Sequence, residues 1–214
     1  RFHPNFDRIG GLKDDLPKGW IADTKAVMGR IRNFCDEIET LLFGNEIFEA
    51  RTRGIGVIPA DVALSYGLSG ANVRASGVDW DLRRARPYSV YDQFEFEVPL
   101  GTVGDCMDRY LVRMEEMRQS IRIIEQALAK LPKGPVLTGD RKVALPPKSE
   151  VYSNIESLMN HFKLIYEGIL APPGEVYGYT EGANGELGYY VVSNGTKHPW
   201  RVKVRPPCYN IYQA

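Results

Sequence analysis

Residues 107–131 carry the strongest periodic pattern in the sequence and read MDRYLVRMEEMRQSIRIIEQALAKL. Apolar side chains recur there at alternating spacings of three and four residues until Pro132 stops the pattern, while charged side chains fill the other faces. The apolar positions are Met107, Tyr110, Met114, Met117, Ile121, Ile124, Leu128 and Leu131. The pattern predicts a long helix that forms the spine of a helical bundle and packs through this apolar seam.

Two further stretches, one on each side of this helix, have the same periodicity. In the first, apolar residues recur at helical spacing between Asp23, the expected N-cap, and Gly44, the expected C-cap. The other begins after Pro147, with Ser149 as its expected N-cap. Its apolar stripe consists of Val151, Ile155, Leu158, Met159, Phe162, Ile165, Tyr166, Ile169 and Leu170. So wide a stripe predicts a third helix that is buried on more than one side.

Near the C-terminus the apolar period changes from helical to two. This change predicts three short strands, at residues 175–181, 186–193 and 200–205, joined by turns rich in glycine and asparagine. The expected fold class is therefore mainly α with a small antiparallel β meander (α+β). Residues 1–173 are expected to form a helical domain with long glycine-rich loops, and residues 174–214 the meander packed on it.

Glycines cluster in the irregular stretch between the first two predicted helices. They are Gly54, Gly56, Gly67, Gly70 and Gly77. So many glycines between helical segments predict tight turns or close approach of backbones. Loops of this length are usually functional or bound to another surface.

The composition excludes several classes of protein. The 27 Lys and Arg residues balance the 27 Asp and Glu residues, so a general polyanion binder is disfavoured. The odd number of cysteines (Cys35, Cys106 and Cys208) argues against a disulfide framework and indicates a reducing compartment. They form no C-x-x-C pair to start a zinc or iron–sulfur site. No apolar window of about 18 residues is present to span a membrane, and no signal peptide is evident at the N-terminus.

Standard catalytic motifs are missing from the sequence. It has no G-x-S-x-G, H-E-x-x-H or G-x-x-x-x-G-K-[ST], and no G-x-G-x-x-G follows a strand to bind NADH. We interpret His161 as a structural histidine on a helix and His198 as an exposed residue in a turn. The sequence therefore gives no nucleophile and base from which to build a catalytic site.

The first eleven residues combine an imidazole, two guanidiniums, two aromatic rings and a Gly-Gly turn. Arg1, His3 and Arg8 lie within eight positions of one another, before Gly10-Gly11. Arginines beside a protonatable histidine suit a site next to a redox group that gains negative charge on reduction and loses it on oxidation, such as an iron–sulfur cluster. The alternative interpretation is an ordinary basic terminus.

Several ordered motifs, which together cover essentially the whole chain, resemble the hydrogenase-like (D-type) subunit of NADH-quinone oxidoreductase, respiratory complex I. The N-terminal match is to R-x-H-x-x-[FY]-x-R-[PI]-G-G-x-x-x-D-L-P, at residues 1–17. The others are Arg53-Gly54-Ile55-Gly56-Val57-Ile58, Tyr66-Gly67-Leu68-Ser69-Gly70, Arg74-Ala75-Ser76-Gly77, Trp80-Asp81-Leu82-Arg83, Pro87-Tyr88-x-x-Tyr91-Asp92, Gly104-Asp105-Cys106-x-Asp108-Arg109-Tyr110, Glu115-Glu116-Met117-Arg118-Gln119-Ser120, Gly185-Glu186-Leu187-Gly188 and the strand of Arg201.

The resemblance implies a helical fold shared with the large subunit of nickel–iron hydrogenases. It implies that the subunit binds no metal itself and packs against a small iron–sulfur subunit. The two would form a cavity for the quinone headgroup, and electrons would pass from the partner's terminal cluster to quinone, coupled to proton translocation. By the same resemblance His3 lies beside that cluster, with Arg1 and Arg8 near it, and NAD is used elsewhere in the complex.

The resemblance also sets limits on the assignment. The family's quinone-contacting histidine and tyrosine precede the matched segment, so quinone-binding residues are unassigned, and the chain is expected to be a central fragment that is inactive alone. Its expected place is peripheral, on the cytoplasmic side of the inner (cell) membrane. It would reach the membrane only through its partners, which include the other peripheral-arm subunits.

Two alternatives remain open from the sequence. One is the large subunit of a membrane-bound nickel–iron hydrogenase, or of a ferredoxin- or deazaflavin-linked oxidoreductase; the three cysteines do not supply the two C-x-x-C pairs that a hydrogenase metal site needs. The other is a nucleic-acid or protein-binding module that uses Arg83-Arg84-x-Arg86 and the Arg201-x-Lys203-x-Arg205 face, which the zero net charge disfavours.

Overall fold

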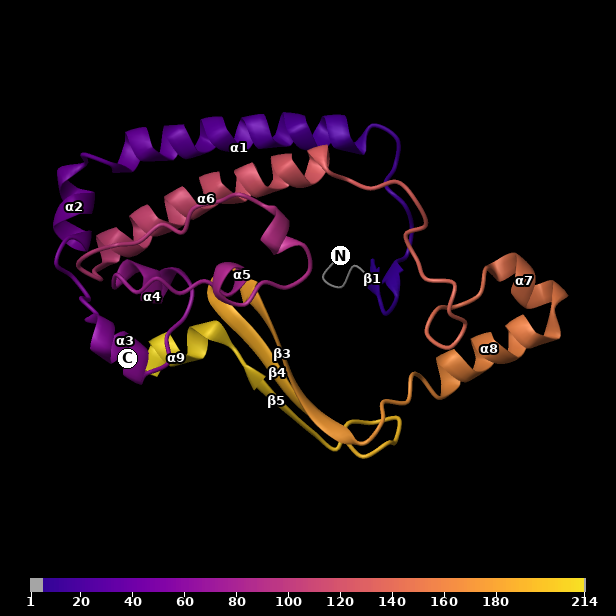
Figure 1. Cartoon of the computed structure of the whole chain (residues 1–214). Helices are drawn as coiled ribbons and strands as arrows, with labels where there is room; N and C mark the ends of the chain where they lie inside the picture. The colour runs from indigo at the N-terminus through magenta and orange to yellow at the C-terminus, as the bar shows by residue number, and fades with distance from the viewer. Residues whose placement is uncertain (1–5, 214) are drawn as a thin grey trace. The chain divides into compact units, whose positions relative to one another are not determined.

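The computed structural model describes residues 6–213 and confirms an α+β fold (Figure 1). The chain forms two compact units. The smaller unit takes in the described residues up to Trp20, with Pro132–Val176 and Val191–Val202. The larger unit takes in Ile21–Leu131, Tyr177–Tyr190 and the described residues from Lys203 onward. The predicted boundary between a helical domain and a meander stays a prediction.

The predicted central helix is α6, which spans Cys106–Ala129 in the larger unit. Asp105 caps it by accepting a hydrogen bond from the backbone N–H of Asp108 at 2.7 Å. Met107, Met114 and Ile121 of the predicted seam are buried, which confirms that the seam contributes to the core. The prediction was wrong for Met117 and Leu131, which are exposed. The helix instead buries a second face, because Val112 packs into a core cluster with Ala71 and Ala75.

Helix α1 spans Trp20–Leu42 and lies beside α6 (Figure 1). Its predicted N-cap Asp23 falls within the first helical turn, so the helix begins earlier than expected. Gly44 follows its end with a φ of 82°, the left-handed conformation expected of a terminating glycine. Arg118 of α6 bridges the two helices through Glu39, at 2.7 Å.

Short helices fill the glycine-rich stretch and the C-terminus of the larger unit. They are α2 (Glu46–Thr52), α3 (Ala60–Ser65), α4 (Ala71–Ala75), α5 (Leu82–Ala85), the 3-10 helix η1 (Tyr91–Gln93) and α9 (Pro207–Gln213). Helix α4 is buried along its whole length and packs on α6. The glycine-rich stretch therefore forms much of the core rather than a set of open loops.

The three predicted strands are confirmed as β3 (Gly174–Gly182), β4 (Gly185–Ser193) and β5 (Arg201–Arg205), in that order within one antiparallel sheet. The turn between β3 and β4 lies against the start of α4. A Cβ on Gly70 would lie 2.4 Å from Gly185 Cα, so glycine is required for this approach. Ser69 Oγ then accepts a hydrogen bond from the N–H of Glu186 at 3.0 Å.

The prediction of a single continuous third helix was wrong. The segment consists of α7 (Lys148–Ser153) and α8 (Ile155–Tyr166), separated by Asn154 in an extended conformation. The Asn154 side chain accepts hydrogen bonds from the first N–H groups of α8, so it starts a new helix instead of continuing the old one. Ser149, the predicted N-cap, lies inside α7.

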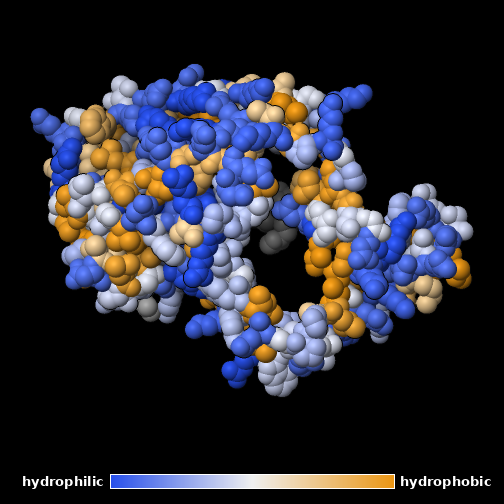
Figure 2. Space-filling view, viewed as in Figure 1, coloured by the Kyte–Doolittle hydropathy of each residue, from blue (hydrophilic) through white to orange (hydrophobic). Residues whose placement is uncertain are grey.

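Burial of the third helix on more than one side was also wrong. Its apolar stripe is largely exposed, with Ile155 at 75%, Phe162 at 57% and Ile165 at 65%. Figure 2 shows hydrophobic residues on the visible surface next to α8. Within the described residues, no helix has both the length and the apolar character needed to cross a membrane.

Candidate functional site

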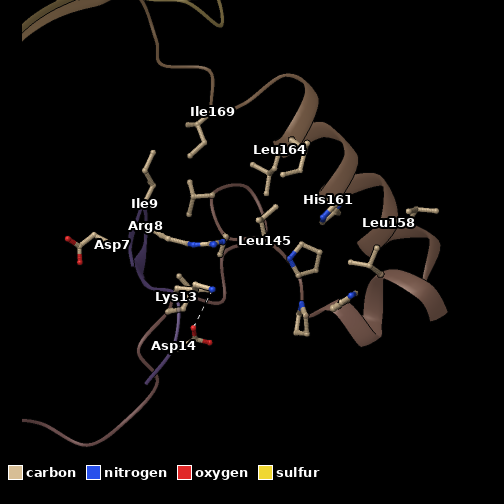
Figure 3. A pocket seen from close by; sticks show the side chains of 18 of the residues that line it. Asp7, Arg8, Ile9, Lys13, Asp14, Leu145, Leu158, His161, Leu164 and Ile169 are labelled. Atoms are coloured by element: carbon tan, nitrogen blue, oxygen red, sulfur yellow. Dashed lines mark ion pairs between the residues drawn. The ribbon is translucent and has the colours of Figure 1, made fainter. Parts of the chain in front are cut away.

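A cavity of about 1200 Å³ lies in the smaller unit, between a small β hairpin and α8 (Figure 3). Its wall is mostly aliphatic and includes the charged side chains of Asp7, Arg8, Lys13, Asp14 and Lys148. Arg8 and Lys13 come from the hairpin, and His161 and Ile165 come from α8. The cavity therefore joins the N-terminal motif to a helix more than 140 residues further along the chain.

The hairpin that carries Arg8 was not predicted. It consists of β1 (Asp7–Arg8) and β2 (Gly11–Leu12), with Arg8 paired to Gly11. Backbone hydrogen bonds of 2.9 Å, from Leu12 to Val136 and from Thr138 to Gly10, add a further segment to it. A Cβ on Gly11 would lie 2.1 Å from the carbonyl oxygen of Val136, so the Gly-Gly turn is what allows this contact.

The Arg8 guanidinium extends into the cavity, and the His161 ring is turned toward the same space (Figure 3). Arg8 Nε is buried and finds no hydrogen-bond acceptor among residues 6–213. Its neighbour Lys13 forms an exposed ion pair with Asp14 at 3.8 Å. A buried donor without an acceptor is costly, so this arrangement is suited to a group that brings an acceptor or negative charge to the cavity.

The other predicted site residues, Arg1 and His3, lie outside the described residues. Among the described residues, no group of three or more His, Cys, Asp and Glu side chains is arranged to hold a metal ion. Cys35 is buried, Cys106 is half-buried and Cys208 is exposed, and all three are free thiols.

A second group of charged side chains, in the larger unit, was not predicted. Arg74 of α4 is 2% exposed and lies within 3.6 Å of Asp81, 2.6 Å of Glu116 and 3.0 Å of Glu181. Arg83 pairs with Asp81 at 2.7 Å. We call these five residues the Arg74 cluster. Several of them belong to motifs already quoted from the sequence, but no local pattern indicates that they meet.

The pKa values within the Arg74 cluster diverge. Burial alone would raise the pKa of the Asp81 carboxyl, but hydrogen bonds from Arg83 and the charges of Arg83 and Arg74 hold it below its usual range. Burial raises the pKa of the Glu181 carboxyl above its usual range, and the charge of Arg74 offsets only part of this effect. Two carboxyls of one cluster are thus shifted in opposite directions.

Several basic residues that a nucleic-acid or protein-binding module would use form hydrogen bonds or ion pairs within the chain. Arg83 is bound to Asp81, and Arg84 donates a hydrogen bond to the carbonyl oxygen of Phe96 at 3.2 Å. Arg205 donates to the carbonyl oxygens of Gly67 and Glu186, at 2.6 and 2.7 Å. These guanidiniums hold segments of the larger unit together.

Comparison with known proteins gives one consistent family. Residues 1–214 match the family described as respiratory-chain NADH dehydrogenase, 49 Kd subunit. The chain is 51% identical over its whole length to the D-type subunit of NADH-quinone oxidoreductase from Myxococcus xanthus, of which it covers 52%. It is 50% identical to the D-type subunit from Leptospira biflexa, of which it covers 53%, and to the C/D-type subunit from Bdellovibrio bacteriovorus, of which it covers 38%. The chain thus spans about half the length of the D-type relatives. It belongs to the family of the 49 Kd subunit of respiratory-chain NADH dehydrogenase.

Proposed function

We propose that this chain is part of a subunit of a proton-translocating NADH:quinone oxidoreductase. In this role it scaffolds a terminal iron–sulfur cluster, held by a small partner subunit, and the quinone cavity that the two subunits share. The observation that carries the proposal is the family match over all 214 residues, with about half of them identical to D-type subunits of NADH-quinone oxidoreductases. The subunit is peripheral, on the cytoplasmic side of the membrane, and this chain alone turns over no substrate.

The cavity of the smaller unit supports a role for Arg8 in this scaffold. A guanidinium is always protonated, so it favours the reduced, more negative state of a nearby redox group. The Gly10-Gly11 turn fixes the strand that carries Arg8. Arg8 Nε has no acceptor among residues 6–213, so it provides a donor for an acceptor from outside the chain. His3 and Arg1 precede this strand and complete the proposed cluster-proximal set with Arg8. The chain supplies charge and donors, while the metal ligands belong to the partner.

The role of His3 can be tested in the assembled oxidoreductase. With His3→Met, the midpoint potential of the terminal cluster should no longer depend on pH, because a thioether cannot take up a proton when the cluster is reduced. The unmodified complex should show a slope of up to about 59 mV per pH unit, the value for one proton per electron. The measurement is a potentiometric titration of the cluster signal at several pH values.

His198→Met is the matched control, since it removes an exposed imidazole from a different segment. It should leave the slope of the cluster unchanged. A His3→Met complex with the slope of the unmodified protein would contradict the assignment of His3.

A further inference from the structure

The Arg74 cluster brings ionisable side chains from four elements into the interior of the larger unit. The exposed fractions of the Arg74, Asp81 and Glu181 side chains are 2%, 1% and 3%. Arg74 belongs to α4, Asp81 caps α5, Arg83 lies within α5, Glu116 belongs to α6 and Glu181 to β3. Ionisable groups this deeply buried must be balanced in charge, because water does not screen them.

The charges of the Arg74 cluster do not balance when every group is ionised. Two guanidiniums, of Arg74 and Arg83, face three carboxylates, which leaves one uncompensated negative charge. Arg113 lines the same cavity, but among the described residues it forms no ion pair within 4.0 Å with these carboxylates, and it donates to the carbonyl oxygen of Ala183 and to Asn184 Oδ1, both at 3.2 Å. One bound proton would make the cluster neutral, and like charges held at short range favour such uptake.

Hydrogen bonding distinguishes the three carboxylates. Asp81 accepts from the Arg83 backbone N–H at 2.8 Å and from two nitrogens of the Arg83 guanidinium, at 3.0 and 2.7 Å. Glu116 accepts from Arg74 Nε at 2.7 Å and lies 2.6 Å from Arg74 Nη2. Both carboxylates are therefore well supplied with donors from charged groups.

Glu181 has the poorest set of donors. Among the residues that the structure describes, its Oε1 accepts from Arg74 Nη1 at 3.0 Å, and its Oε2 makes only a long contact of 3.4 Å with the Leu82 N–H. Arg74 Nη1 also donates to the carbonyl oxygen of Trp80 at 3.0 Å, so Glu181 shares this donor. An ionised carboxylate is stabilised by the hydrogen bonds it accepts, so the ionised form of Glu181 is the least stabilised of the three carboxylates.

The Arg74 cluster also borders open space. A cavity of about 520 Å³ is lined by Arg74, Arg83, Glu116 and Glu181, together with residues of α6 and the β3–β4 turn. Water has room in a polar cavity of this size, so protons have a route to the buried carboxylates.

We propose that the Arg74 cluster is a proton-binding site, in which Glu181 takes up a single proton while Asp81 and Glu116 stay ionised. The opposite pKa shifts of Asp81 and Glu181 agree with this division. The other titratable or charged groups near Glu181 are Arg83, Arg113 and Tyr88, whose hydroxyl accepts a hydrogen bond from the Glu181 N–H. Tyr91 interacts with Tyr88 and Arg83. Burial raises the pKa of Tyr88, so this phenol stays neutral while Glu181 titrates. The site lies in the larger unit and does not depend on the assignment of His3 or Arg8.

The proton can be detected by NMR on the chain labelled with ¹³C at the glutamate carboxyl carbons. We expect one glutamate carboxyl to remain protonated at pH values where the exposed glutamates are already ionised. This signal should be lost in Glu181→Gln and kept in Glu97→Gln, which removes a carboxyl that is 82% exposed. The proposal would be overturned if every glutamate titrated over the same pH range as the exposed ones. It would also be overturned if the carboxyl that stays protonated to higher pH were still seen in Glu181→Gln.

A second variant separates proton binding from simple packing, and it serves equally if Glu181→Gln does not fold. Glu116→Gln removes a negative charge that competes for Arg74, so the Arg74 guanidinium should stabilise the ionised Glu181 carboxylate more strongly. The pH midpoint at which the Glu181 carboxyl titrates should therefore move to lower pH. An unchanged midpoint in Glu116→Gln would mean that Glu181 does not share its proton equilibrium with this cluster, and the proposal would be wrong.

Discussion

Arg74→Met should lower the free energy of unfolding by about 3–5 kcal/mol, the usual effect of removing one partner from a buried ion pair. Arg74 is 2% exposed and is the only cation of its cluster, within the described residues, that contacts all three carboxylates. Methionine has a similar length but no charge, so Glu181 and Glu116 would remain buried without their donor. Denaturant unfolding followed by circular dichroism measures the loss.

Two further variants define how that loss arises. Arg32→Met removes a surface ion pair with Glu125 and should cost less than about 1 kcal/mol. The N–O distance of this pair, 2.7 Å, lies within the 2.6–3.6 Å range of the cluster. The double variant Arg74→Met, Glu181→Gln should lose less than the sum of its two single variants, because Glu181→Gln removes a carboxyl that Arg74→Met has already left without its guanidinium donor. A loss for Arg74→Met as small as that for Arg32→Met would contradict the structural role of the cluster.

Ile121→Ala should lower the free energy of unfolding by about 2–5 kcal/mol, since it removes buried methyl groups and leaves a cavity in the middle of α6. Ile121 is 2% exposed and follows Met114, which is also buried, along the seam. The same denaturant unfolding experiment measures the effect.

Met117→Ala provides the control on the same helix. Met117 is 37% exposed, so its truncation should cost less than about 1 kcal/mol. An equally small loss of unfolding free energy for Ile121→Ala would show that this part of α6 is an exposed partner-binding surface and not part of the core.

Much of the fold follows from local patterns. The alternation of apolar and charged residues located α6 to within two residues at each end, and the change of period located all three strands of the sheet. The break at Asn154 was missed because the apolar spacing continues across it, while a single side chain accepting two N–H groups starts the second helix. Periodicity reports which face is apolar, and it does not report whether that face is covered, as the exposed stripe of α8 shows.

The candidate sites were harder to predict from the sequence than the fold. The motif around Arg8 was recognised, but its cavity depends on a pairing of the N-terminal hairpin with residues 136–138, which no local signal indicates. The Arg74 cluster joins residues up to 107 positions apart, so its partners could not be identified before the fold was known. His3 and Arg1 remain predictions.

The most direct test of membership in an NADH:quinone oxidoreductase is recovery of this chain, carrying an affinity tag, together with the small iron–sulfur subunit of the same organism. The proposed function predicts a one-to-one complex that retains the spectrum of the partner's cluster. A correctly folded chain that is recovered without this subunit would contradict the proposed scaffold role.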